Sequence, residues 1–73
     1  MADKTLAIKK NVAGSWYVDE SCIGCGLCAS TAANNFIMDD DKAYVAKQPT
    51  ASELADCQAA QESCPVQAIG DDR

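Results

Sequence analysis

The sequence contains no histidine and few aromatic residues, with one Trp, one Phe and two Tyr among 73 residues. Without histidine, a Rieske centre, a His-ligated haem and every zinc site of mixed Cys/His ligation are excluded. No apolar run reaches the roughly 18 residues that a membrane-spanning helix requires, so we expect no membrane segment. The first ten residues also lack the apolar stretch of a signal peptide, which favours a location in the reducing cytoplasm.

Basic side chains are scarce: six Lys and Arg stand against eleven Asp and Glu, for a formal net charge of −5. The distribution is uneven, because residues 1–10 carry +2 and the remainder carries −7. An acidic body disfavours binding to nucleic acid, whose phosphates attract basic patches. It favours a partner protein with a basic docking face, although many proteins are acidic only for solubility.

Cysteine, by contrast, is plentiful, with five in a short chain. Three cysteines are separated by two residues each, and a fourth precedes a proline far along the sequence; these are Cys22, Cys25, Cys28 and Cys64. Soft thiolates select iron–sulfur clusters, zinc or Cu(I) over hard cations. A four-cysteine zinc site is the main competitor. Zinc ribbons present two separated C-x-x-C pairs, however, so a triplet with a distant Cys-Pro matches them poorly and favours a cluster.

The second half of the chain repeats the cysteine frame of the first half at an offset of 32 residues (57 − 25 = 32). In two-cluster proteins the fourth cysteine of each run ligates the cluster of the other run. By that rule the one complete site consists of Cys22, Cys25, Cys28 and Cys64. The second site would need positions 54, 57, 60 and 32, which hold Leu, Cys, Ala and Ala. The frame therefore predicts one cluster and not two.

Residues next to the cysteines suit such a site. Gly24 and Gly26 alternate with the cysteines of the triplet. Glycine lets the backbone wrap closely and take a positive φ, which turns N–H groups toward sulfur. Such hydrogen bonds help to set a cluster's reduction potential. Pro65 is expected to keep Cys64 out of helical conformation.

These motifs resemble the bacterial-type ferredoxins, specifically their small members with a single 4Fe–4S cluster. The resemblance covers about residues 15–70 and rests on CIGCGLC, on the distant SCPVQAI and on the lone Cys57. In many relatives the cysteine at that position is half of a disulfide, but the partner position here is Ala32. The resemblance therefore implies no intramolecular disulfide. What it implies for function is a soluble one-electron carrier.

We expect this carrier to be a cytoplasmic monomer of low potential that shuttles electrons between oxidoreductases through one 4Fe–4S cluster. No general acid/base pair, activated nucleophile or phosphate-binding loop suggests an enzyme. Two alternatives stay open. One is a small iron–sulfur subunit held permanently in an oxidoreductase complex, which an exposed apolar patch would mark. The other is a structural four-cysteine zinc protein.

The fold is expected to be α+β, of the ferredoxin type, with two β-α-β units related by pseudo-twofold symmetry around one cluster. The whole chain, residues 1–73, reads as one domain, with residues 1–14 as an N-terminal extension that forms a short strand and turn or a frayed arm. The patterns predict four strands and two helices. The strands are residues 15–18, 36–38, 43–46 and 66–69, and the helices are residues 27–33 and about 51–62. Thr50 and Glu53 form the capping box of the second helix.

Cys57 is expected to be a small buried hydrophobe, together with Leu54 and Ala60, in the volume of the missing second cluster. A spare ligand and a redox-sensing thiol are its alternative roles. No neighbouring Lys, Arg or His would lower the pKa of such a thiol.

Three further groups are assigned from the sequence. Trp16 and Tyr17 are expected to be core residues rather than an electron path. Asp19 and Glu20 precede the cluster loop directly and are the candidates for docking a redox partner. The acidic stretch at residues 39–41 is expected to be a solvated hairpin tip.

Overall fold

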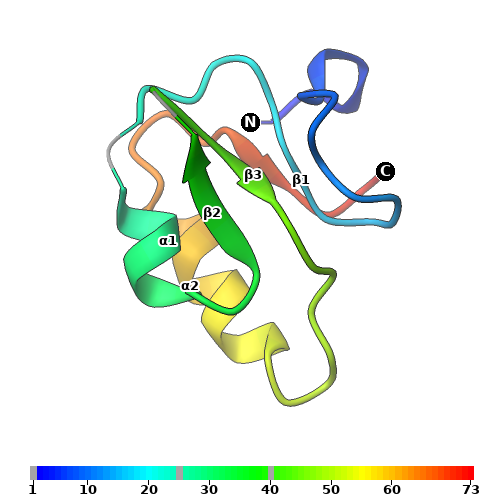
Figure 1. Cartoon of the computed structure of the whole chain (residues 1–73), viewed down its shortest axis with the longest axis vertical. Helices are drawn as coiled ribbons and strands as arrows, with labels where there is room; N and C mark the ends of the chain where they lie inside the picture. Colours follow the sequence, from blue (N-terminus) through cyan, green and yellow to red (C-terminus); the bar gives the residue numbers. More distant parts are fainter. Residues whose placement is uncertain (1, 25, 40) are drawn as a thin grey trace.

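The computed structural model describes residues 2–24, 26–39 and 41–73. It has the α+β architecture that the sequence predicts, with two helices packed side by side against short two-stranded sheets (Figure 1). The elements, in chain order, are η1 (a 3-10 turn, Lys4–Leu6), β1 (Tyr17–Val18), α1 (Leu27–Thr31), β2 (Phe36–Asp39), β3 (Lys42–Val45), α2 (Leu54–Ser63) and β4 (Ile69–Gly70). Along the described ranges, none of the helices is long and apolar enough to cross a membrane.

The first sheet joins strands from opposite halves of the chain. β1 pairs antiparallel with β4, and Val18 lies opposite Ile69. Both strands are shorter than the predicted 15–18 and 66–69. Within the predicted strand 66–69, Gln67 adopts a left-handed φ of 53°. An extended strand does not accommodate this φ, so β4 begins only after Gln67.

The second sheet is the predicted hairpin of β2 and β3. The pairing is antiparallel and extends to Asp39 opposite Lys42, two residues that the sequence places in the turn. The hairpin tip is therefore tighter than expected. Asp40, within the predicted acidic tip, lies outside the described residues, and Asp41 is exposed.

α2 begins later than the capping box predicts. The expected helix runs from about residue 51 with Thr50 as its N-cap, whereas α2 starts at Leu54 with Glu53 at the N-cap position. Only half of the box forms. The Glu53 carboxylate accepts a hydrogen bond from the Thr50 backbone N–H (3.0 Å), but the Thr50 hydroxyl contacts the Ser52 hydroxyl (3.1 Å) instead of capping the helix.

The core lies between the two helices and the strands. Its cluster of buried side chains includes Val18, Phe36 and Val45, and Trp16 is only 5% exposed. Tyr17 is also fully buried, but outside this cluster, and its hydroxyl donates to the Asp72 carboxylate (2.6 Å). The expectation that Trp16 and Tyr17 serve as core residues is therefore confirmed. Aliphatic and aromatic side chains from both sheets thus form one apolar layer under the helices.

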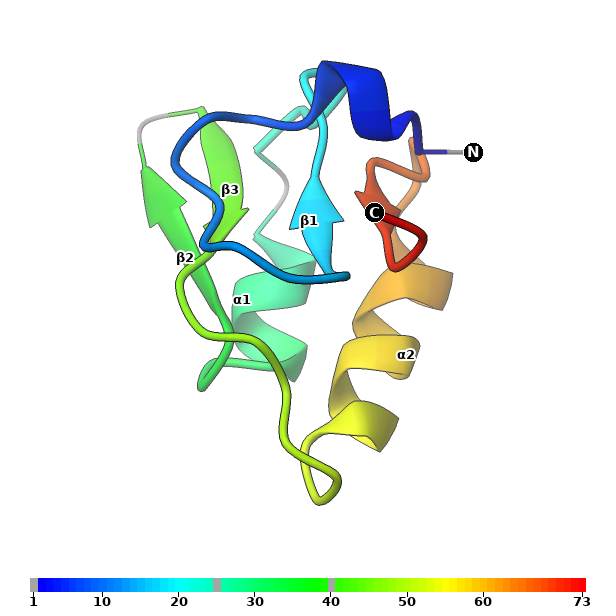
Figure 2. The same ribbon diagram turned by 90° about the vertical axis from the view of Figure 1, so that its right-hand side faces the viewer.

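The N-terminal segment packs along the sheets rather than fraying (Figure 2). The backbone N–H of Ile8 donates to the Val18 carbonyl (2.9 Å), and that of Val12 donates to the Val45 carbonyl (2.9 Å). The side chain of Asn11 also bonds to the backbone of both strands. The segment forms a 3-10 turn and one isolated bridge instead of the expected strand. Its hydrogen bonds hold it beside the loop that leaves β1.

Candidate metal centre

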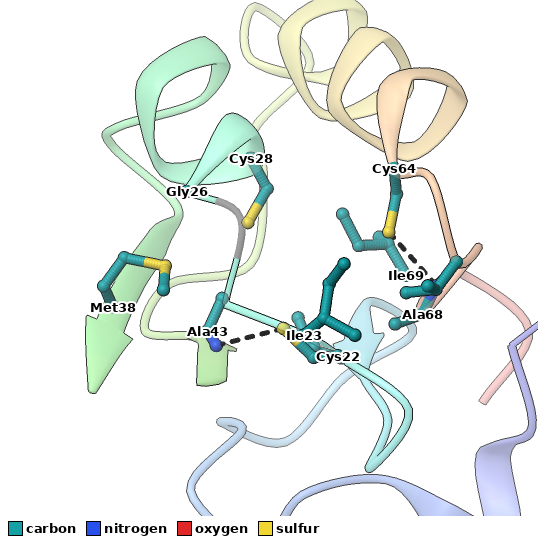
Figure 3. Close-up of a pocket in the computed structure, with 11 residues that line it drawn as sticks. Cys22, Ile23, Gly26, Cys28, Met38, Ala43, Cys64, Ala68 and Ile69 are labelled. Atoms are coloured by element: carbon teal, nitrogen blue, oxygen red, sulfur yellow. Dashed lines mark hydrogen bonds between the residues drawn. The ribbon is translucent and has the colours of Figure 1, made fainter. Parts of the chain in front are cut away.

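Three of the four predicted ligands line one cavity, although they come from three different places in the fold (Figure 3). Cys22 lies in the loop after β1, Cys28 in the first turn of α1, and Cys64 directly after α2. The fourth, Cys25, lies outside the described residues. The remaining lining is apolar and includes Val18, Ile23, Met38, Val66, Ala68 and Ile69. The site is thus a set of thiols in an apolar pocket.

Backbone N–H groups point at two of the sulfurs. The Sγ of Cys22 accepts from the N–H of Gly24 (3.5 Å) and of Ala43 (3.4 Å). The Sγ of Cys64 accepts from the N–H of Ala68 (3.3 Å). Hydrogen bonds of this kind stabilise the thiolate form, which is the form that binds a metal. The pocket therefore provides sulfur donors together with backbone N–H dipoles directed at two of them.

The two glycines of the cysteine loop have the predicted backbone conformation. Gly24 has a φ of 72° and Gly26 a φ of 79°. A Cβ at Gly24 would lie 2.4 Å from the carbonyl oxygen of Asp41, whereas a Cβ at Gly26 would meet nothing within 4 Å. Gly24 is thus required for close packing of the loop on the hairpin tip, and Gly26 only for its turn into α1.

The Cys64-Pro65 step ends α2 as expected. Cys64 has an extended backbone (φ −68°, ψ 116°), which fits the restriction that a following proline imposes. The chain then turns, with the N–H of Gln67 donating to the Cys64 carbonyl (3.2 Å). That turn brings the N–H of Ala68 to the Cys64 sulfur.

Cys57 does not line this cavity. Its side chain is fully buried, it is a free thiol, and burial together with Glu53 and Asp56 raises its pKa. The prediction of a small buried hydrophobe is confirmed, and a protonated thiol is poorly suited to redox sensing. Ala60 is fully buried as well, but Leu54 is 38% exposed, so the expectation that Leu54 fills a second-cluster volume is wrong.

The predicted docking role of Asp19 is also wrong. Its side chain is only 2% exposed. Its carboxylate accepts hydrogen bonds from the backbone N–H of Asp3 (2.9 Å) and from the N–H (2.9 Å) and hydroxyl of Ser21. The N-terminal segment covers it, because Ala7 forms a bridge with Asp19. Glu20 remains exposed.

Sequence reasoning missed Lys42. Its Nζ donates a 2.7 Å hydrogen bond to the backbone carbonyl of Cys22. Nothing in the local sequence signals this contact, because it depends on how the tip of the β2–β3 hairpin meets the cysteine loop.

The donor set fits a cluster. The thiolates of a cubane bind different iron atoms, so they need only surround a common cavity. Cys22, Cys28 and Cys64 do so.

Sulfur donors, an apolar pocket and N–H···S hydrogen bonds together are typical of iron–sulfur proteins. Comparison with known proteins identifies the family. Residues 18–71 match the model of the 4Fe–4S single-cluster domain of ferredoxin I. A ferredoxin of Thermococcus litoralis is 47% identical over 53 residues, which cover 68% of this chain and 83% of that protein. No solved structure matches.

The chain therefore belongs to the ferredoxin family, as an iron–sulfur electron carrier. The narrower assignment to bacterial-type ferredoxins is not confirmed, because the relative is archaeal.

Proposed function

We propose that this ferredoxin carries one electron at a time on a single 4Fe–4S cluster bound by Cys22, Cys25, Cys28 and Cys64. The observation that carries the proposal is that Cys22, Cys28 and Cys64 line one apolar cavity. When bound, the cluster supplies a one-electron couple. The chain supplies its ligands, the N–H groups that stabilise the thiolates, and the apolar side chains that limit water around it.

A single cluster is supported by the second frame. Its positions hold Leu54, Cys57, Ala60 and Ala32, of which the last three are buried in close packing. Cys57 contributes the one sulfur there, and burial raises its pKa. One protonated thiol among packed alanines cannot hold a second cluster.

A duplicated β-α-β fold is supported by the strand pairing. The first unit contains β1, α1 and β2, and the second contains β3, α2 and β4. Exchanging the two units turns the β1–β4 pair into the β3–β2 pair, and both are antiparallel. The helices that the exchange relates, α1 and α2, pack against each other. This pattern is what a pseudo-twofold axis would produce.

Transfer between separate oxidoreductases, at low potential, is the role we propose for this couple. Adding an electron to a protein with a formal net charge of −5 is electrostatically unfavourable, which lowers the reduction potential. The same charge favours partners with basic docking faces.

A permanent subunit of an oxidoreductase complex is the second candidate. Ile23, beside the cavity, is 60% exposed, and Leu27, at the start of α1, is 44% exposed. A constant contact would cover such side chains. Gel filtration of a fresh native extract distinguishes the two, since a free carrier elutes near the 7.7 kDa of the chain.

Metal and sulfide analysis of natively purified protein tests the proposal. We expect about four iron and four sulfide per chain. One zinc without sulfide would overturn the cluster, and about eight iron would overturn the single site. A potential clearly above 0 mV would remove the low-potential role alone.

A further inference from the structure

The tip of the β2–β3 hairpin contacts the loop of the first proposed ligand at three points. The Nζ of Lys42 donates to the Cys22 carbonyl (2.7 Å), and the N–H of Ala43 donates to the Cys22 sulfur (3.4 Å). The carbonyl of Asp41 lies so close to Gly24 that a Cβ there would be 2.4 Å away. Of these contacts, only the one from Lys42 brings a positive charge to the site.

The ammonium group of Lys42 is directed to the cysteine loop rather than to a carboxylate. Among the described residues, the ion pairs are Lys10 with Asp39 and Lys47 with Glu53. Glu20 lines the same surface groove as Lys42, but neither ion pair includes Glu20 or Lys42. Lys42 is half-buried, so water screens its charge less than that of a free surface lysine.

We propose that Lys42 is a positioning residue that fixes the Cys22 loop and raises the reduction potential of the cluster. The inference rests on the proposed ligand set. Reduction adds one negative charge to the cluster, and a positive charge nearby stabilises the reduced form more than the oxidised form. Lys42 thus partly offsets the acidic body of the protein at the point where the electron arrives.

Protein-film voltammetry on natively purified holoprotein tests this. Lys42→Met should lower the reduction equilibrium constant about tenfold, which corresponds to about 59 mV for one electron. Lys42→Arg keeps the charge and should keep most of the potential. Lys47→Met is the matched control, because it removes the same charge at the Glu53 end of α2, about 15 Å of helix away from Cys64. It should shift the potential far less.

Iron and sulfide content, measured on the same samples, separates this inference from the proposed function. Wild-type protein without a 4Fe–4S cluster would overturn the function itself. Wild type and Lys42→Met with equal cluster content and equal potentials would overturn the role of Lys42 alone. If Lys42→Met lost its iron, the neutral Lys42→Gln would replace it in the voltammetry. Loss of iron from both Lys42→Met and Lys42→Gln, with full iron content in Lys42→Arg and Lys47→Met, would establish the positioning role directly.

Discussion

The backbone N–H of Asp3 donates a 2.9 Å hydrogen bond to the carboxylate of Asp19, a residue that is only 2% exposed. The same carboxylate binds the N–H and hydroxyl of Ser21, the residue before Cys22. Asp19 therefore ties the N-terminal segment to the start of the cysteine loop. An acidic side chain that looks like a docking group in the sequence is a structural link in the fold.

Replacing Asp19 with alanine is expected to destabilise the protein. Three donors on the exposed residues Asp3 and Ser21 lose their acceptor, and each intramolecular hydrogen bond contributes about 0.5–1.5 kcal/mol net. Urea unfolding of the holoprotein, followed through the visible absorbance of the cluster, measures the loss. Glu20→Ala is the control, since this neighbour is exposed and should change stability by no more than about 0.5 kcal/mol. Equal effects at the two positions would contradict the link.

Gly24→Ala is expected to reduce cluster binding, whereas Gly26→Ala is tolerated better. Both residues have a positive φ, so both changes carry the strain of about 1–2 kcal/mol of a left-handed alanine. Only the methyl group at position 24 collides with the Asp41 carbonyl. Iron per chain after identical purification should therefore fall clearly further for Gly24→Ala. Less iron in Gly26→Ala than in Gly24→Ala would mean that the loop does not pack on the hairpin as described.

The positions that sequence reasoning assigned well depend on local chemistry. Glycines in the cysteine loop need a positive φ, Pro65 keeps Cys64 extended, and a polar turn between two apolar segments in residues 36–46 produces a hairpin. Each of these follows from a few adjacent residues. Local preference was enough to predict them.

The positions that it missed depend on contacts between distant segments. Lys42 reaches Cys22 across two elements, and the extension that buries Asp19 carries no motif of its own. The capping box failed for a similar reason. The Glu53 carboxylate is also bound by Asn35 and Lys47, which lie outside the box, and residues 51–53 form a turn before α2 begins.

Cys57→Ala is expected to keep the cluster, and Cys64→Ala to lose it. Cys57 is buried away from the cavity, and removing its sulfur should cost at most about 2 kcal/mol as a small truncation. Cys64 lines the cavity and accepts the N–H of Ala68. The visible spectrum and the iron content of the two variants give the answer. A cluster retained in Cys64→Ala but absent in Cys57→Ala would mean that the fourth ligand is Cys57.

Glu53 is expected to make the free energy of unfolding depend on pH below 4.5, the ordinary pKa of its carboxyl group. Hydrogen bonds from the Thr50 N–H and the Asn35 side chain, with smaller contributions from Lys47, lower the pKa of Glu53 from 4.5 to about 2. A lowered pKa in the folded state stabilises the protein above the unfolded value. That contribution is lost as the pH falls from 4.5 toward 2.

Urea unfolding of wild type and Glu53→Gln at pH 7 and at pH 4 tests this. The difference in free energy of unfolding between the two proteins should be largest at pH 7 and smaller at pH 4. Since both carry the same site, acid sensitivity of the cluster itself cancels in the difference. Glu62→Gln, at an exposed position of α2, is the control for a loss of charge. A difference that did not change with pH would contradict a lowered pKa.

Charge steering is expected to govern how fast the reduced protein gives up its electron. The chain has a formal net charge of −5, and a reduced cluster with four thiolates adds about −3. A cationic inorganic oxidant should react faster at low salt, and an anionic one more slowly. As the Debye length shrinks from about 30 Å at 0.01 M to about 8 Å at 0.15 M, the two rates should converge from opposite directions.

Stopped-flow oxidation at several salt concentrations measures both rates, with an uncharged oxidant as the control. Rates for both charged oxidants that matched the control at every salt concentration would mean that the acidic surface serves solubility alone. The permanent-subunit alternative would then gain support.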